Sequence, residues 1–452
     1  MAGGLIQLIA YGAQNYLLNG NPSVSFFKKV YKTHTNFAME SMRVTCNKNY
    51  IHFNDKTTLI TKIKRNADLI QDVYFTMEIP DIKKVIKKNS DGNIIGDDFR
   101  FVKNLGEVML EEYQVYVGGS IVDRQYGEWL HIWNELSVES SKRYGYDKLI
   151  GNVPELYIPD PFNRQNHNHI QIDERRIYVP LKFWFNRNPG LALPLVALQY
   201  HEIEIHIILR PLKELYTLNA EKPSSWEQHG KPYFGNTEIV QINPYLEVNY
   251  IFLDSQERNF FATNSHDYLI EQTMRIEVPN VKRNAVTDLT LQNPVKELLW
   301  VFKRNDADEL NKWFNFTDFN YLSTKTVLDE NDQEVNVSSY RDAPILKNAK
   351  LILNGMDRFE EKDATYFNLI QPYQHHTVIP KEGIYAYSFS LYPESFQPSG
   401  ACNMSRIKSV QLKTETLPLP TDSAYNYDMT IYVNNYNFLR VSAGLGGLAF
   451  SW

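Results

Sequence analysis

The sequence predicts a mainly β protein made of two tandem antiparallel sandwiches, and three observations point to that fold class. Aromatic residues, which are enriched in strands, make up 13% of the 452 residues. Most segments with a clear pattern are short, rich in β-branched residues and bounded by turn residues. A succession of strands and turns also occurs twice along the chain, which indicates a duplicated domain.

Strand patterns outnumber helical ones. The expected strands are Leu69–Ile79, Tyr113–Val117, Ile177–Phe185, Ala197–Leu209, Leu246–Leu253, Glu297–Phe302 and Leu351–Leu353. Two segments have helical spacing instead: Tyr126–Ser137, with two tryptophans on its apolar face, and the shorter Glu360–Ile370. We therefore expect short helices only in the connections.

The internal repeat consists of two independent blocks in the same order. The segments 118–124 (GGSIVDR) and 354–358 (NGMDR) each follow an apolar strand and precede one of the helical segments. Further along, a strand from Ile177, a turn and a second strand recur as a strand from Ile384, a turn and a second strand. Because glycine suits a turn with positive φ, we expect the two glycine turns at equivalent strand-to-helix corners, with Asp123 and Asp357 in matching places.

Two tandem eight-stranded antiparallel jelly rolls, a double jelly roll with short helices in its loops, fit this repeat. We place an N-terminal arm at 1–24, the first jelly roll at 25–215, a linker at 216–243 and the second jelly roll at 244–452. The polar segments 80–104, 143–174 and 304–347 are expected to be long loops. Loops of this length usually carry function or interfaces.

Charge and cysteine content exclude some classes of function. A net charge of −6 is too close to neutral for a protein that binds nucleic acid over its whole surface. Cys46 and Cys402 are too far apart in sequence for a disulfide framework, so we expect free thiols and a reducing compartment. The first 60 residues carry a charge of +4, which suits an acidic partner or anionic lipid but also ordinary fluctuation. We expect neither a signal peptide nor a membrane-spanning helix.

Catalytic and metal-binding patterns are weak throughout. The phosphate loop, the G-x-S-x-G elbow and the H-E-x-x-H motif do not occur. His167, His169 and Glu174 have a spacing that a cupin-like metal site could use, although a polar loop explains it better. Glu202, Glu204 and His206 share one face of an expected strand, as any half-buried strand allows. These observations predict no catalytic, cofactor-binding or metal-binding residue.

Two further polar runs have ordinary explanations. His375-His376 follows Pro372-Tyr-Gln and is expected to lie in a turn rather than to bind a ligand. The run Lys83–Lys88 has no interleaved aromatic residue and is followed by Asp97-Asp98, which favours a solvated loop over a nucleic-acid contact.

Several long strings resemble one protein family across the whole chain. The first, at Gly3–Ser41, is GGLIQLIAYGAQNYLLNGNPSVSFFKKVYKTHTNFAMES. Others, in the same order as in the family, are NRNPGLALPLVALQYHEIEI, NYIFLDSQER, HDYLIEQ, FQPSGACNMSRI and NYNFLRVSAGLGGLAF. These strings are similar to major capsid proteins of nucleocytoplasmic large DNA viruses, nearest to the algal-virus and giant-virus branch.

The resemblance implies a structural protein without catalytic residues. It implies a double jelly roll, in agreement with the repeat, and homotrimers with a pseudo-hexagonal outline that tile an icosahedral shell over an internal membrane. Neighbouring capsomers and minor capsid proteins would be its partners, with the inner viral membrane near the N-terminal arm and no specific nucleic acid or cofactor. The protein would reside in the virion and be made and assembled in the host cytoplasm.

Two other function classes stay open from the residues alone. A carbohydrate-binding jelly-roll attachment protein would use loop aromatics to stack on sugars, and a cupin-like enzyme would use His167, His169 and Glu174. Glycan binding by the isolated protein would distinguish the first alternative, and stoichiometric metal would distinguish the second.

Overall fold

The computed structural model describes residues 34–85, 87–88, 94–95, 99–158, 169–217, 237–328, 334–420 and 423–450. The chain divides into two compact units, Met1–Phe37 and Ala38–Trp452. The expected N-terminal arm at 1–24 lies outside the described residues. Apart from Phe37, all of the architecture below belongs to the second unit.

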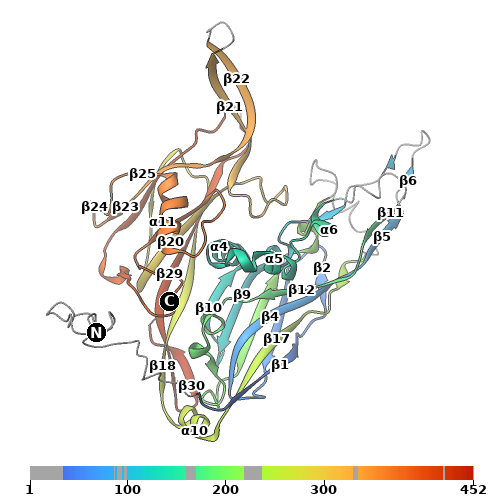
Figure 1. Ribbon diagram of the computed structural model, residues 1–452, viewed down its shortest axis with the longest axis vertical. Helices are drawn as coiled ribbons and strands as arrows, with labels where there is room; N and C mark the ends of the chain where they lie inside the picture. The colour runs from blue at the N-terminus through green and yellow to red at the C-terminus, as the bar shows by residue number, and fades with distance from the viewer. Residues whose placement is uncertain are drawn as a thin grey trace, which may run out of the picture. The chain divides into compact units, whose positions relative to one another are not determined.

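Each half of this unit is a jelly roll of two facing antiparallel sheets (Figure 1). In the first jelly roll, one sheet has the order β1-β17-β4-β12 and the other has the order β10-β9-β14-β3. The bounds of these strands are β1 (Phe37–Thr45), β3 (Thr57–Ile63), β4 (Leu69–Ile79), β9 (Leu110–Val117), β10 (Ser120–Tyr126), β12 (Arg175–Pro180), β14 (Ile203–Leu209) and β17 (Tyr245–Leu253). A short strand, β13 (Leu193–Pro194), adds to β4.

The second jelly roll repeats this topology strand for strand. Its sheets have the orders β18-β29-β20-β26 and β24-β23-β28-β19, and β27 (Cys402–Asn403) adds to β20 as β13 adds to β4. The bounds are β18 (His266–Val278), β19 (Asn284–Asp288), β20 (Pro294–Arg304), β23 (Leu346–Leu353), β24 (Met356–Asp357), β26 (Ile384–Ser388), β28 (Val410–Thr416) and β29 (Tyr427–Ser442), with β30 (Leu445–Leu448) paired to β29. The duplication and the double jelly roll are confirmed.

Alternation of apolar and polar residues explains how each sheet covers a core. In β14 the isoleucines at 203, 205 and 207 are buried while the residues between them stay half exposed, because successive side chains point to opposite faces. The first core contains Phe53, Phe75 and Tyr113, and a separate core in the second jelly roll contains Trp300 and Met429.

The two glycine turns are equivalent, but they join two strands rather than a strand and a helix. Gly118 and Gly119 connect β9 to β10, and Asn354 and Gly355 connect β23 to β24. All four residues have positive φ, which is the geometry of a type I′ hairpin turn. The aspartates lie on equivalent strands in different settings, because a bulge precedes Asp123 and buries it, whereas Asp357 is exposed and binds Lys350 at 2.7 Å.

Three segments expected to be loops contain regular structure. The segment 80–104 carries β5 (Ile82–Val85), β6 (Lys87–Lys88), β7 (Ile94–Ile95) and β8 (Arg100–Phe101) and leads into α3 (Leu105–Met109). The segment 143–174 contains most of α5 (Ser140–Leu149), with α6 (Pro154–Tyr157) and β11 (His169–Ile172). Helix α5 buries only Tyr146, so it has no apolar stripe that the sequence could reveal.

The segment 304–347 is mainly a β-hairpin. Its strands are β21 (Thr317–Leu328) and β22 (Glu334–Pro344), which pair with each other and with no other described strand. The hairpin extends beyond the sheets of the second jelly roll in Figure 1. Most of its residues are polar, so its sequence lacks the apolar face that marks a sheet strand.

The expected helices and strand ends need adjustment. Helix α4 (Gly127–Ser137) matches its expectation, but the second helical segment begins later than Glu360 and extends past Ile370, as the π-helical turn η5 (Tyr366–Ile370) followed by α11 (Gln371–His375). The strand from Ile177 ends at Pro180, and residues after it form α8 (Trp184–Arg187) and η1 (Pro189–Leu191). The strand expected from Ala197 begins only at Ile203.

The segment between the jelly rolls contributes strands to the first one. Within the expected linker, β15 (Tyr216–Thr217) pairs with β8, and β16 (Ile239–Gln241) pairs with β2 (Tyr50–His52). Strand β17, which lies beyond the boundary expected at 243, pairs with β4 in the first sheet. We therefore propose that the first jelly roll extends to Leu253 and that α10 (Ser255–Thr263) leads into the second.

The type I′ turns lead to a prediction in which alanine substitutions at two glycines change the free energy of unfolding in opposite directions. Gly355→Ala should lower the free energy of unfolding by about 1–2 kcal/mol, because an L residue is strained at its φ of +80°. Gly145→Ala, in helix α5, should raise it by about 0.5–1 kcal/mol. An added Cβ meets nothing within 4 Å at either site, so denaturant unfolding isolates the backbone effect. Shifts in the same direction for both variants would contradict the turn assignment.

Candidate functional site

The cupin-like metal site gains no support from the residues that can be placed. His167 lies outside the described residues, His169 begins β11, and Glu174 is exposed in the turn before β12. Across the described part of the chain, no three His, Cys, Asp or Glu side chains gather as metal ligands would.

The carboxylates of Glu202, just before β14, and of Glu204 on β14 are neutralised by a neighbouring strand. Lys62 of β3 binds Glu202 at 2.8 Å and Glu204 at 3.4 Å, and His206 Nε2 lies 2.8 Å from Glu204. The His206 hydrogen bond, together with Lys62, lowers the pKa of Glu204. The His206 ring also packs on Tyr116. This is a cross-strand ion-pair cluster on the solvent face of a sheet, the usual use of such a pattern.

His376 is the chemically unusual group that the sequence did not reveal. Its side chain is 1% exposed and lies between two carboxylates, Glu297 at 3.3 Å and Glu394 at 2.9 Å. Burial alone would lower the pKa of His376, but the two carboxylates outweigh it and raise the pKa to about 9. Burial would likewise raise the pKa of Glu297, yet His376 and Lys296 hold it below its usual value. Glu297 also accepts a hydrogen bond from Asn434 at 2.6 Å.

The imidazolium ties a surface segment to the sheet. Glu297 lies on β20, His376 directly follows α11, and Glu394 lies in the connection after β26. Thr377 donates its backbone N–H to Glu394 at 3.1 Å, and His375 Nδ1 lies 2.9 Å from the Leu391 carbonyl oxygen. A buried charge in this position holds three segments together, which is a structural rather than a catalytic role.

The contact between the two jelly rolls is built around helix α4. Trp129, Ile132 and Trp133 of α4 pack on the second jelly roll, on the face of the β18-β29-β20-β26 sheet that points away from its own core. The side chains that receive them are Leu299, Val301, Ile384, Ala386 and Tyr432. The Tyr432 hydroxyl donates to Glu128 at 3.0 Å at the start of the helix. The two halves of the unit therefore share a third, mainly aromatic core.

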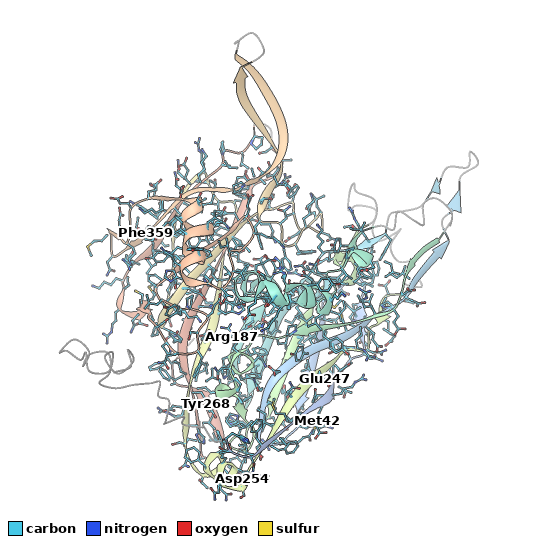
Figure 2. All side chains as sticks on the ribbon, in the orientation of Figure 1. Met42, Arg187, Glu247, Asp254, Tyr268 and Phe359 are labelled. Atoms are coloured by element: carbon cyan, nitrogen blue, oxygen red, sulfur yellow. The ribbon has the colours of Figure 1, made fainter. Side chains whose placement is uncertain are left out.

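Buried charges cross the same contact. Arg187 of the first jelly roll binds Glu271 of β18, and Figure 2 shows Arg187 between the two halves. Lys296, whose side chain is fully buried, binds Glu271 at 2.5 Å and donates to the Pro393 carbonyl oxygen at 2.6 Å. The Arg187 guanidinium lies 4.4 Å from the centre of the Trp133 ring. One carboxylate thus compensates two cations that come from different jelly rolls.

Two further buried acids lie near this contact. Burial raises the pKa of Asp123 to about 7 against the opposing effect of Arg187, and Gln125 donates to its carboxylate at 3.0 Å. Glu107 of α3 is fully buried; burial alone would raise its pKa, but the His131 ring nitrogen at 2.8 Å and neighbouring donors lower it. Glu107 also accepts a hydrogen bond from Tyr146 of α5, which anchors that polar helix.

The two cysteines belong to different cores. Cys46 packs against the first core and accepts a hydrogen bond from Thr61 at 3.2 Å, whereas Cys402 packs against the second core. Burial raises the pKa of both thiols. In the described residues, no helix has the length and apolar character that crossing a membrane requires.

The fold and its contacts define a class of protein. Two jelly rolls of identical topology, joined by a packed helix and buried ion pairs, form a double jelly roll whose conspicuous chemistry is structural. Comparison with known proteins agrees. Residues 25–254 match the family described as major capsid protein N-terminus, and residues 257–447 match the family described as large eukaryotic DNA virus major capsid protein. The chain belongs to the major capsid proteins of large eukaryotic DNA viruses.

Individual relatives are similar over their full length. The major capsid protein of Phaeocystis pouchetii virus is 34% identical, and that of Paramecium bursaria Chlorella virus 1 is 33% identical, each with 100% of both chains covered. Among solved structures, VP54 of PBCV-1 superposes with a TM-score of 0.71 at 30% identity, over 95% of this chain and 100% of that one. The Faustovirus major capsid protein shares the fold, with a TM-score of 0.71 at 14% identity, over 96% of this chain and 94% of that one. This chain is therefore a structural protein of a virus capsid.

The His376 cluster leads to a pH prediction. Because the folded-state pKa of His376 lies above its unfolded value of about 6.5, its contribution to stability should be complete below pH 6.5 and fade as pH rises through about 9. At pH 6, His376→Gln should cost about 3–5 kcal/mol, as when one partner of a buried ion pair is removed. Denaturant unfolding from pH 6 to 10 measures this.

The neighbouring histidine provides the control for that measurement. His375 contacts a backbone carbonyl oxygen instead of a carboxylate, so His375→Gln should cost about 1 kcal/mol. If His376→Gln kept the same pH profile as His375→Gln, the charged state of His376 would be refuted.

The ion pairs between the jelly rolls lead to a second prediction, which compares substitutions of two acidic residues on strand β18. Glu271→Gln should lower the free energy of unfolding by about 3–5 kcal/mol, because Lys296 and Arg187 lose their shared carboxylate. Asp267 lies on β18 as well and forms an exposed ion pair with Arg440 of β29, so Asp267→Asn should leave the melting temperature unchanged. Equal melting temperatures for the two variants would show that Glu271 does not hold the halves together.

Proposed function

We propose that this chain assembles as a homotrimeric capsomer with a pseudo-hexagonal outline, and that such capsomers tile an icosahedral virus shell. The strand-for-strand duplication supports this most directly. Two jelly rolls of the same topology in each chain give six comparable lobes when three chains close around a threefold axis. Such a ring fits a sixfold lattice position although only its threefold axis is a true symmetry.

Closed rings need two different complementary faces on each subunit, and the duplication supplies them. The two jelly rolls share a topology but differ in their surfaces: helix α4 of the first is buried against the second, whereas its counterpart η5–α11 leaves Ile370 and Tyr373 exposed. One jelly roll can therefore meet the other jelly roll of a neighbour. For an obligate oligomer, we expect each contact to bury on the order of 2,000 Å² or more.

The long insertions lie at one end of the jelly-roll topology, and we assign that end to the outer face of the capsomer. Strand β5, inserted between β4 and β9, pairs with β11, inserted between β10 and β12, so the two insertions meet. The β21–β22 hairpin occupies the same topological place between β20 and β23. The segments 143–174 and 304–347 would then be exposed to the exterior, and neighbouring capsomers would meet along the sides.

The remaining assignments follow from family membership and from charge. The N-terminal arm at 1–24, outside the described residues, would lie on the inner side, with the inner viral membrane or minor capsid proteins as its partners. Assembly would take place in the host cytoplasm. We assign no enzymatic activity, no catalytic, cofactor-binding or metal-binding residue and no specific nucleic acid, since the placed polar clusters are all explained by structural ion pairs.

Light scattering on the purified chain tests the proposal. A mass three times the 52.8 kDa of the chain is expected at micromolar concentration, and electron microscopy should show particles with a hexagonal outline. A persistent monomer under these conditions would contradict a homotrimeric capsomer. A trimer without a hexagonal outline would contradict the arrangement of six lobes.

A further inference from the structure

Both jelly rolls line a cavity of about 650 Å³. The first contributes residues 100–104 and Tyr157, and the second contributes residues 310–317 and 381–382. His131 of α4 is also part of the wall and stacks on the Phe314 ring, with the two ring centres 4.3 Å apart. The volume falls within the range of pockets that bind small molecules, roughly 300–1,000 Å³.

The cavity lies at the end of the molecule that carries the long insertions. Strand β8, which includes Arg100, belongs to the insertion between β4 and β9. Residues 310–317 lead from β20 to the β21–β22 hairpin, and Ile384, which also lines the cavity, pairs with Val301 near the end of β20. If this end faces outward in a capsomer, as proposed above, the cavity is on the exterior side of the shell.

Positive charge gathers on the cavity wall of a chain whose net charge is −6. Three cations line the cavity and form no ion pair within the described part of the chain: Arg100, Lys103 and Lys312. A fourth, Lys381, is paired with Glu135 at 3.0 Å. The cavity is also lined by the carboxylates of Asp342 and Glu382, but neither forms an ion pair with the three cations. These cations are not members of the structural ion-pair clusters described above.

Neighbouring side chains position two of these cations. Arg100 donates its Nε hydrogen to Thr217 Oγ1 at 2.9 Å, and the terminal nitrogens of its guanidinium make no hydrogen bond to a described residue. Lys103 Nζ lies 5.4 Å from the centre of the Tyr157 ring, within cation–π range. A positioned guanidinium suits a carboxylate or a phosphate-like tetrahedral anion, because its N–H groups form a planar fork.

Lys312 is the third cation, and positive charge surrounds it. Its Nζ lies 3.7 Å from the centre of the Phe319 ring. Burial lowers the pKa of Lys312, and the guanidinium groups of Arg304 and Arg100 lower it further against the opposing effect of Asp342. An anion bound in the cavity would offset the repulsion between these cations.

The rest of the wall suits hydroxyl groups and flat apolar faces. The Asn315 carbonyl oxygen accepts hydrogen bonds from the Thr317 backbone N–H at 3.1 Å and from its hydroxyl at 2.6 Å, so the amide N–H groups of Asn315 are left for a ligand. Tyr157 and Phe314, both half-buried, add aromatic surface. Sugars combine hydroxyl groups with C–H faces that pack on aromatic rings.

We propose that this cavity binds an acidic saccharide, a sugar chain that carries carboxylate or sulfate groups, and that Arg100, Lys103 and Lys312 bind those groups. A saccharide is favoured over other anions by the hydroxyl-binding groups of the wall and by its position, since a site on the exterior of a shell meets the glycans of a cell surface. The argument from position rests on the outer face assigned under the proposed function, whereas binding needs only a single folded chain.

Isothermal titration calorimetry of the purified chain tests this site. A sulfated tetrasaccharide from heparin should bind once per chain, and its Kd should rise with salt because ions screen exposed charges. The neutral tetrasaccharide cellotetraose should not bind measurably. Lys103→Gln with Lys312→Gln should raise the Kd for the heparin tetrasaccharide about tenfold or more, because two hydrogen bonds to a charged group are lost.

A second pair of lysines provides the matched control. Lys282 and Lys408 are exposed and lie outside the cavity. Lys282→Gln with Lys408→Gln removes the same charge from the chain and should leave the Kd unchanged. Circular dichroism should show that both double variants are folded. Equal weakening by the two pairs would mean that the tetrasaccharide responds only to overall charge, which overturns the site.

Two further outcomes would also overturn the inference. Absence of saturable binding by the heparin tetrasaccharide contradicts the site itself, and equally tight binding of ATP contradicts the choice of a saccharide. The result is separate from the proposed function. A monomeric chain that binds the tetrasaccharide contradicts the homotrimeric capsomer alone, whereas a trimer with a hexagonal outline that does not bind it overturns this inference alone.

Discussion

The packing of helix α4 on the second jelly roll is the contact on which the rest of the structure depends. Each jelly roll packs a core between its two sheets, and the first core continues into Ile270, Leu439 and Val441 of the second jelly roll. The third core, around Trp129, Trp133 and Tyr432, together with the carboxylate of Glu271, turns two similar domains into one body. These contacts, together with the β18 and β29 residues that pack in the first core, hold the two lobes at one relative orientation. In a shell built from copies of this chain, the angle between the two lobes is therefore the same in every copy.

The buried charges are best understood as determinants of orientation. An ion pair in an apolar contact adds little net stability over well-packed apolar side chains, but a broken one is costly. Glu271 can satisfy Arg187 and Lys296 only when the two jelly rolls are correctly placed. His376 acts similarly on a smaller scale, because Glu297 and Glu394 come from segments nearly 100 residues apart in sequence. The aromatic packing stabilises the contact between the two jelly rolls, and the ion pairs restrict that contact to one geometry.

Sequence patterns predicted the fold where a strand covers a core and failed where it does not. Strand β4 was predicted with its bounds, because its buried apolar residues alternate from Val73 to Ile79 and turn residues flank the run. The repeat was visible in turns whose positive φ favours Gly and Asn. Helix α5 and the β21–β22 hairpin were expected to be loops, because both sequences are mainly polar. His376 looked like a turn residue because its carboxylate partners are distant in sequence and come together only in the fold. Nothing in the pattern around Arg187 distinguishes a buried cation from a surface one.

The pairing of β5 with β11 has a consequence for how this surface can change. The two strands come from different insertions, yet each satisfies the other's backbone hydrogen bonds over four residue pairs, from His169–Val85 to Ile172–Ile82. Shortening one insertion alone would expose an unpaired strand edge in the other, and such edges recruit strands from other molecules. The two insertions must therefore diverge together, by matched changes in length. The β21–β22 hairpin pairs only with itself among the described strands and can lengthen or shorten on its own. Variation at this end of the molecule is thus coupled in one jelly roll and independent in the other.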